Sequence, residues 1–125
     1  MAPVADREAL AAAVQDEEAV LELSKRLGVV GVHMFCEGEN GVTAHCRNFA
    51  PLYGIPEESA TGTSNGALTW YLYTHQKLEP GRDNLFLQGE SMGKPSRVFT
   101  RLIEDGGQFL VQVGGEVCPA EELEF

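Results

Sequence analysis

Basic residues are scarce in this sequence. Its 125 residues include 9 lysines and arginines against 19 aspartates and glutamates, which gives a formal net charge of −10 at pH 7. Because a chain this acidic repels polyanions, the composition argues against nucleic acid, and against an anionic membrane surface, as its natural partner. Any site for a small anion must therefore use local backbone dipoles against a repulsive overall field.

Long apolar runs and paired cysteines are also missing. No stretch is long and apolar enough to predict a signal peptide or a membrane span. The three cysteines are an odd number without metal-type spacing, which argues against a disulfide framework. Together these absences predict a cytoplasmic protein in a reducing compartment.

No repeat or low-complexity segment interrupts the chain. With 43% hydrophobic residues, a chain of this length can bury roughly two-thirds of its unfolded surface and hold one core. We therefore expect residues 1–125 to form a single domain.

The segment 57–73 is the stretch around which we expect the rest of the chain to be organised. Two acids open it, small residues that include Gly62 and Gly66 follow, and residues 67–73 are apolar or aromatic with one exception. A helix with no polar stripe is typical of a buried position. We expect the helix from about Thr63 to Lys77 to be the most buried element, enclosed by a curved mixed sheet.

The start of this helix has no acidic side chain to balance its partial positive charge. Between Thr61 and Ala67 the sequence contains neither Asp nor Glu, and the two glycines would let a ligand approach the backbone. This pattern favours a site for an external carboxylate or phosphate at the first-turn amides. The other interpretation is that Thr63 or Ser64 is an ordinary N-cap and that the small residues serve tight packing.

A second helix is predicted from Asp16 to Leu27. Asp16 is typical of an N-cap, acidic residues follow in the first turn, and Gly28 stands just past the end. Its apolar residues recur at helical spacing on one face, so we expect it on the outside of the sheet. The remaining pattern predicts an alanine-rich short helix within residues 1–14 and strands near 3–4, 29–36, 42–49, 84–88, 96–103 and 108–113.

The predicted hairpin of residues 29–49 carries two histidines and two cysteines, namely His33, Cys36, His45 and Cys46. A metal site would need several of these side chains on one side. Successive strand residues face opposite sides, however, so His45 and Cys46 cannot both ligate one ion. We expect buried thiols, partnered histidines and no metal.

Arg47 lies near two acids in the sequence. It precedes Glu57 and Glu58 by about ten residues, across a turn that contains Pro51. An arginine in this place can pair with one of those acids or hold the carboxylate of a ligand. The residues alone leave both interpretations open.

Four separated motifs are similar to those of one known family. They are RNFAP at 47–51 with Gly-Ile at 54–55, EESATGTS at 57–64, QGESMGKPS at 88–96 and VGG at 113–115. In this order they resemble the second half of the PhzF-like proteins of phenazine biosynthesis, in the diaminopimelate epimerase superfamily. The resemblance runs from about Pro3 to Val117. It implies an α+β domain, a curved mixed sheet wrapped around a central helix, with the N-terminal half of the family absent.

The same resemblance implies an activity. Members of the family that the sequence resembles are isomerases or epimerases that need no cofactor. They move a proton next to a carboxylate or carbonyl of a small molecule bound between two domains. By motif, Glu58 stands where the family has an aspartate that contacts the substrate, and Thr63 stands where it has a serine. We therefore expect Glu58 and Thr63 at the catalytic positions, and Thr61, Gly62, Thr63 and Ser64 around the substrate's carboxylate.

Several departures from the family pattern bear on activity. Glu58 replaces aspartate, Ser59 replaces proline, Thr63 replaces serine, and Thr61 occupies the place of the catalytic cysteine of racemase relatives. The family's main catalytic glutamate belongs to the N-terminal domain, so this chain alone is expected to be an incomplete isomerase. A second copy in a homodimer, or a separate chain, would supply the missing half. The alternative is a catalytically inactive binding or structural module that keeps only the fold.

Overall fold

The computed structural model describes residues 1–117, which leaves the last eight residues, Cys118 among them, outside the described part. In chain order the elements are β1 (Ala2–Pro3), α1 (Arg7–Ala12), α2 (Glu17–Leu27), β2 (Val32–Glu37), β3 (Ala44–Ala50), the 3-10 turn η1 (Pro51–Tyr53), β4 (Ile55–Glu58), α3 (Gly62–Thr74), β5 (Asp83–Gln88), the 3-10 turn η2 (Glu90–Met92), β6 (Ser96–Asp105) and β7 (Gln108–Gly115).

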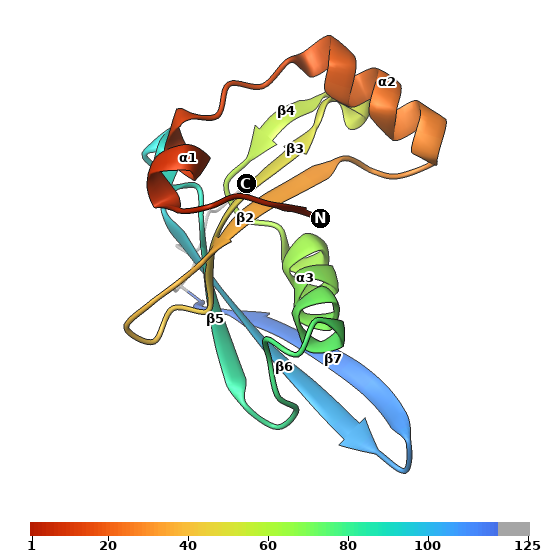
Figure 1. The fold of residues 1–125 in the computed structure, drawn as a ribbon, viewed down its shortest axis with the longest axis vertical. Helices are drawn as coiled ribbons and strands as arrows, with labels where there is room; N and C mark the ends of the chain where they lie inside the picture. Colours follow the sequence, from red (N-terminus) through yellow and green to blue (C-terminus); the bar gives the residue numbers. More distant parts are fainter. Residues whose placement is uncertain (118–125) are drawn as a thin grey trace, which may run out of the picture.

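The seven strands form one mixed sheet in the order β1-β2-β3-β5-β6-β7, with β4 paired to β3 outside this path. The β1–β2 and β3–β5 pairs are parallel and the others are antiparallel. The sheet bends strongly, so that α3 lies on its concave side between the β2–β3 strands and the long β6–β7 hairpin (Figure 1). The predicted α+β fold, a curved mixed sheet around a central helix, is confirmed.

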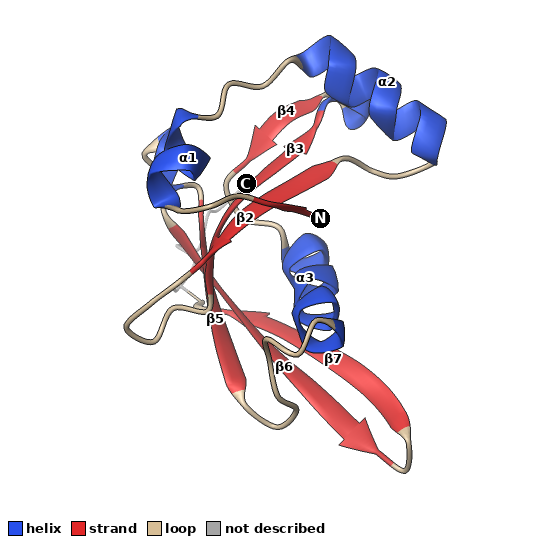
Figure 2. Cartoon of the chain, viewed as in Figure 1, coloured by secondary structure: helices blue, strands red, loops and turns tan. Residues whose placement is uncertain are grey.

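The apolar core lies between α3 and the concave side of the sheet. It is formed by a cluster of buried side chains from α3 and four strands, together with Leu78 after the helix: Phe35, Ala44, Cys46, Leu68, Leu72, Leu78, Phe86, Val98 and Leu102. The helices α1 and α2 lie on the opposite face of the sheet (Figure 2). None of the helices within residues 1–117 is long and apolar enough to cross a membrane.

The expectation that α3 is the most buried element is wrong. All seven residues of β3 are buried, because this strand packs on Leu68 and Leu72 of α3 on one face and contacts α1 and α2 on the other. In α3, by contrast, Thr63 and Ala67 are exposed and Trp70 is 43% exposed. The Trp70 ring packs on the Tyr73 and Phe109 rings, at 5.4 and 5.3 Å between centroids. The sequence of this helix indicates that none of its faces is polar, but it does not indicate how many of those faces the sheet covers.

The helix α2 matches its prediction at both ends. The Asp16 carboxylate accepts a hydrogen bond from the Ala19 amide at 3.0 Å, and Gly28 takes a left-handed conformation with φ of 63° just after the helix. In contrast, β4 was not among the predicted strands. It carries Pro56 and two acids, which are tolerated because β4 pairs with β3 alone and is an edge strand.

Removing core volume from α3 tests this packing. Leu68 is fully buried in the core cluster, so Leu68→Ala is expected to lower the free energy of unfolding by about 2–5 kcal/mol. The matched control is Leu110→Ala, because Leu110 on β7 is 60% exposed. Urea denaturation followed by circular dichroism would measure both. Equal, small losses in the two variants would contradict the placement of α3 in the core.

Candidate functional site

A cavity with a volume of about 860 Å³ opens at the N-terminus of α3. Its lining includes every predicted site residue, namely Glu58, Thr61, Gly62, Thr63 and Ser64. His33 and Asn48 of the neighbouring strands also line it. The structure thus brings the predicted residues to one place, and their catalytic and binding roles stay predictions.

The helix begins at Gly62 and ends at Thr74, whereas the predicted helix ran from about Thr63 to Lys77. Thr61 is the N-cap, and the first helical hydrogen bond runs from the Asn65 amide to the Thr61 carbonyl at 3.1 Å. An N-cap at Thr63 or Ser64 is therefore wrong. Both residues belong with Gly62 to the first turn, whose amides precede the hydrogen-bond ladder. No acidic residue lies in this turn, and the Thr61 side chain makes no capping hydrogen bond. These amides are therefore available to an anion in the cavity.

The two glycines of this helix start have different surroundings. A Cβ at Gly66 would lie 3.1 Å from Val113 Cγ2 of β7, and Gly66 does not line the cavity. Gly66 therefore serves the packing of α3 on β7, and its predicted role in ligand approach is wrong. Gly62 lines the cavity, although a Cβ there would also meet Val113 at 3.2 Å.

Gln88, at the end of β5, ties the N-terminus of α3 to β4. Its side chain is completely buried. The Oε1 atom accepts hydrogen bonds from the Thr61 amide at 3.2 Å and from Asn65 Nδ2 at 2.8 Å. The Nε2 atom donates to the Glu58 carbonyl at 2.7 Å and to Thr61 Oγ1 at 2.9 Å. One buried amide thereby sets the position of the helix start relative to Glu58.

The Glu58 carboxylate is held by two donors. Thr61 donates its hydroxyl hydrogen to Oε2, and Asn48 Nδ2 approaches the same oxygen at 3.5 Å. Glu58 is partly exposed and lines the cavity beside the first turn of α3. A carboxylate in this place can exchange a proton with a ligand whose own carboxylate is bound by the helix amides.

His33 also belongs to the site, although the sequence predicted only a structural role for this residue. The ring lies between two amide oxygens, with Nδ1 at 3.0 Å from Asn48 Oδ1 and Nε2 at 3.2 Å from Asn65 Oδ1. Burial lowers the pKa of His33, against the effect of the two hydrogen bonds. The strand alternation contained the signal, because His33 and the core residue Phe35 lie on the same face of β2.

Arg47 is buried on the opposite face of β3. It makes two hydrogen bonds to Glu57, at 2.9 and 3.0 Å, and its Nη1 atom donates to the carbonyls of Leu10 and Ala13 at 3.0 and 2.7 Å. The ion-pair interpretation is therefore confirmed, with Glu57 rather than Glu58 as the partner. The alternative role as a clamp for a ligand carboxylate is wrong, because protein groups occupy the guanidinium.

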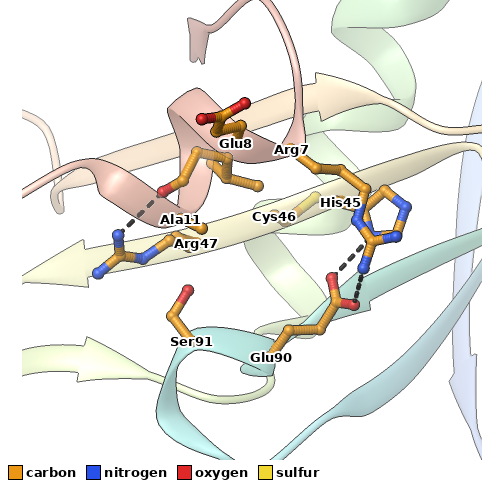
Figure 3. Close-up of a pocket in the computed structure, with 9 residues that line it drawn as sticks. Arg7, Glu8, Ala11, His45, Cys46, Arg47, Glu90 and Ser91 are labelled. Atoms are coloured by element: carbon orange, nitrogen blue, oxygen red, sulfur yellow. Dashed lines mark hydrogen bonds and ion pairs between the residues drawn. The ribbon is translucent and has the colours of Figure 1, made fainter.

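A smaller cavity of about 380 Å³ lies beside Arg47, between β3, α1 and η2. There, Arg7 and His45 both point toward Glu90, with Nη2 to Oε1 at 2.9 Å and Nδ1 to Oε2 at 2.6 Å (Figure 3). The predicted partnering of both histidines is thus confirmed. Burial raises the pKa of the Cys36 and Cys46 thiols, so neither is an activated nucleophile in the folded chain.

Comparison with known proteins adds family information to this geometry. Residues 1–122 match the PhzC-PhzF family, described as phenazine biosynthesis-like protein. A relative from Deinococcus radiodurans, named an uncharacterized isomerase, is 38% identical over 128 residues, which cover 98% of this chain and 40% of the relative. The trans-2,3-dihydro-3-hydroxyanthranilate isomerase of Pseudomonas aeruginosa is 40% identical over 55 residues, 44% of this chain and 20% of that enzyme.

Solved structures share the fold. The Bacillus anthracis phenazine biosynthesis protein of the PhzF family superimposes with a TM-score of 0.79 and 22% identity, over 90% of this chain and 40% of that one. A predicted epimerase from Pseudomonas aeruginosa superimposes with a TM-score of 0.52 and 22% identity, over 85% of this chain and 37% of that one. The chain spans about 40% of the length of these relatives.

The role of Gln88 can be tested by replacing its amide with an apolar side chain of similar length. Gln88→Met leaves the Thr61 amide and the Asn65 side chain without their buried partner, so we expect a loss of about 3 kcal/mol or more in the free energy of unfolding. Gln108→Met on the exposed end of β7 is the control and is expected to change little. A stability of Gln88→Met equal to that of the control, measured in urea, would refute the role given to Gln88.

Proposed function

The chain belongs to the phenazine biosynthesis-like family, and from this membership we propose that it supplies the carboxylate-binding half of an isomerase that needs no cofactor. The reaction moves a proton between carbons next to a carboxylate or carbonyl of a small molecule. The supporting observation is the convergence of Glu58 with the unpaired amides of the first turn of α3 on one cavity.

The first turn of α3 has the chemistry to stabilise the charge that develops in such a reaction. Removing a proton next to a carboxylate places extra negative charge on its oxygens. The amides of Gly62, Thr63 and Ser64 point out of the helix start and carry the positive end of its dipole. In this proposal the Thr63 hydroxyl, exposed at the cavity, donates a further hydrogen bond to the substrate.

Glu58 is the proposed acid–base group. Its carboxylate lines the cavity, and Oε2 is held by Thr61 and Asn48. A proton shift between two carbons ordinarily needs one group to take the proton and one to return it. We assign one of these roles to Glu58, which stands where the family motif has a substrate-contacting acid. The second group and the cover over the substrate are therefore assigned to another domain.

The rim of the cavity supports a covering partner. Four apolar side chains around it are exposed: Val29 by 42%, Val30 by 62%, Tyr53 by 64% and Ile55 by 39%. An exposed apolar rim around a polar site is typical of an interaction surface. We assign it to a second copy of this chain in a homodimer, with a separate chain of N-terminal type as the other candidate. Closure would also exclude water from the charged groups.

A second function remains a candidate. Glu58, Ser59 and Thr63 all depart from the family pattern, and the Glu58 side chain already satisfies two protein donors. These observations favour a catalytically inactive module that binds carboxylates or has only a structural role. Such a module would keep its ligand contacts without transferring a proton.

The proposed location is the cytoplasm. Cys36 and Cys46 are buried free thiols, which suits a reducing compartment. The net charge of −10 disfavours nucleic acid and anionic membranes as partners.

Anion binding at the first turn can be measured by NMR. Titration with sodium acetate is expected to shift the amide signals of Gly62, Thr63 and Ser64, and Thr63→Val is expected to weaken binding by about 1 kcal/mol, roughly fivefold, because one donor is removed. Thr74→Val, at the other end of α3, is the matched control and should bind as the parent chain does. First-turn signals that stay in place throughout the titration would refute this site.

The covering partner can be tested by sedimentation at micromolar concentration. We expect a dimer, and we expect Val30→Glu on the cavity rim to weaken it by at least tenfold, since two introduced charges would be buried at a twofold interface. Val14→Glu introduces the same charge at a site that is 93% exposed and does not line this cavity, so it should leave the dimer intact. Detection of only a 13.6 kDa monomer would eliminate the homodimer.

A further inference from the structure

The hydrogens around His33 are determined by groups anchored to the backbone. Gln88 Oε1 accepts from the Thr61 amide and Gln88 Nε2 donates to the Glu58 carbonyl, so this side-chain amide has one possible orientation. Asn65 Nδ2 then faces two acceptors, the Thr61 carbonyl at 2.9 Å and Gln88 Oε1 at 2.8 Å. Asn65 Oδ1 must therefore face His33 Nε2, and that ring nitrogen carries a hydrogen.

Asn48 has no such anchor. Its side chain lies between His33 Nδ1, at 3.0 Å, and Glu58 Oε2, at 3.5 Å. With Nδ2 toward Glu58, the carboxylate is ionised and Asn48 Oδ1 faces His33 Nδ1, which must then be protonated. With the amide rotated by half a turn, Nδ2 donates to a neutral His33 and Oδ1 faces Glu58, which must then carry the proton.

In both arrangements Asn48 is hydrogen-bonded to His33 and to Glu58. In each, one proton is shared between these two residues, and their charges sum to zero. An arrangement without this proton places Asn48 Oδ1 against either a ring nitrogen lone pair or an ionised carboxylate, and both contacts are repulsive. An arrangement with two protons buries an uncompensated charge on His33, which is 4% exposed. We propose that His33, Asn48 and Glu58 hold a single proton, and that the orientation of the Asn48 amide is coupled to whether His33 or Glu58 carries it.

The groups around His33 act in opposite directions. Burial lowers the pKa of His33 and so favours the proton on Glu58, and the α-amino group of Met1 acts in the same direction. Thr61 and Asn48 both donate to Glu58 Oε2, and the hydrogen bonds of Asn48 and Asn65 to the ring raise the pKa of His33. The residues that contact the ring from β3 and α3, Asn48 and Asn65, are uncharged, so Glu58 is the acid that faces His33 through Asn48.

Through this coupling, a bound carboxylate would change the protonation of Glu58 and His33 together. This step rests on the proposed function. A carboxylate bound at the first turn of α3 lies next to Glu58 and disfavours a second negative charge there. One proton then leaves His33 Nδ1 and one proton arrives on Glu58 through the water of the cavity that both residues line, while Asn48 rotates. His33 is thus a positioning residue that makes Glu58 a proton donor when the ligand is bound.

The test is a pH titration of the histidine ring signals by NMR. Glu58→Gln removes the negative charge and provides a neutral donor for Asn48 Oδ1, so the pKa of His33 is expected to fall by about one unit. Glu39→Gln removes the same charge from an exposed loop and should leave His33 unchanged. The exposed His75 serves as an internal reference in every sample.

Asn48→Asp separates coupling from a purely structural role. Its carboxylate accepts directly from His33 Nδ1, so the pKa of His33 is expected to rise, and adding Glu58→Gln to this variant should then have less effect than in the parent chain. A His33 titration that is the same in the parent and in Glu58→Gln would overturn the inference. So would a drop in pKa from Glu58→Gln that is undiminished in the Asn48→Asp background.

Acetate distinguishes this inference from the proposed function. At constant pH near neutrality and constant ionic strength, replacing chloride with acetate should shift His33 toward its neutral form in the parent chain and not in Glu58→Gln. Coupled titrations without any effect of acetate would support the shared proton and contradict the carboxylate site. An effect of acetate that is equal in the parent and in Glu58→Gln would contradict the shared proton.

Discussion

The buried side-chain amide of Gln88 is the constraint on which the geometry of this site depends. It lies at the end of β5, and its four hydrogen bonds reach the backbone of β4, the N-cap of α3 and the first buried polar side chain of that helix. An unsatisfied polar group at this depth would be costly, so these partners cannot separate without breaking the whole set. The acid on β4 and the amides of α3 are thereby held around one cavity.

This network also explains why the helix start lacks an ordinary cap. The Thr61 hydroxyl would usually accept a hydrogen bond from the first turn, but here it accepts from Gln88 and donates to Glu58. The first-turn amides are left unpaired as a result. Local helix stability is reduced at this point, and the tertiary contacts that hold Thr61 compensate for it. Such an exchange of local stability for exposed donors is typical of sites that bind anions.

The opposite face of the sheet has a different character. There Arg47 is occupied by Glu57 and by carbonyls at the end of α1, and His45 is occupied by Glu90. These ion pairs fasten α1 and η2 to β3 and leave no charged group free to bind a ligand among the residues that form them. The two faces of β3 therefore have different roles. One face attaches α1, and the other carries the candidate site.

Features set by neighbours in sequence were predictable from the sequence alone. The helix α2 carries its caps and its dipole charges within its own residues, and the β6–β7 turn is specified by consecutive glycines. The motif at 57–64 also placed Glu58 and the first-turn residues in one site. Strand alternation placed His33 on the core face of β2, and β4 depended on its pairing with the nearby β3. The start of α3 and the packing role of Gly66 depended on Gln88 and β7, whose contacting residues lie 23 to 47 residues away in the sequence. Only tertiary structure decided the start of α3 and the role of Gly66, because hydrogen bonds and side-chain contacts between distant segments have no periodicity or local pattern in the sequence.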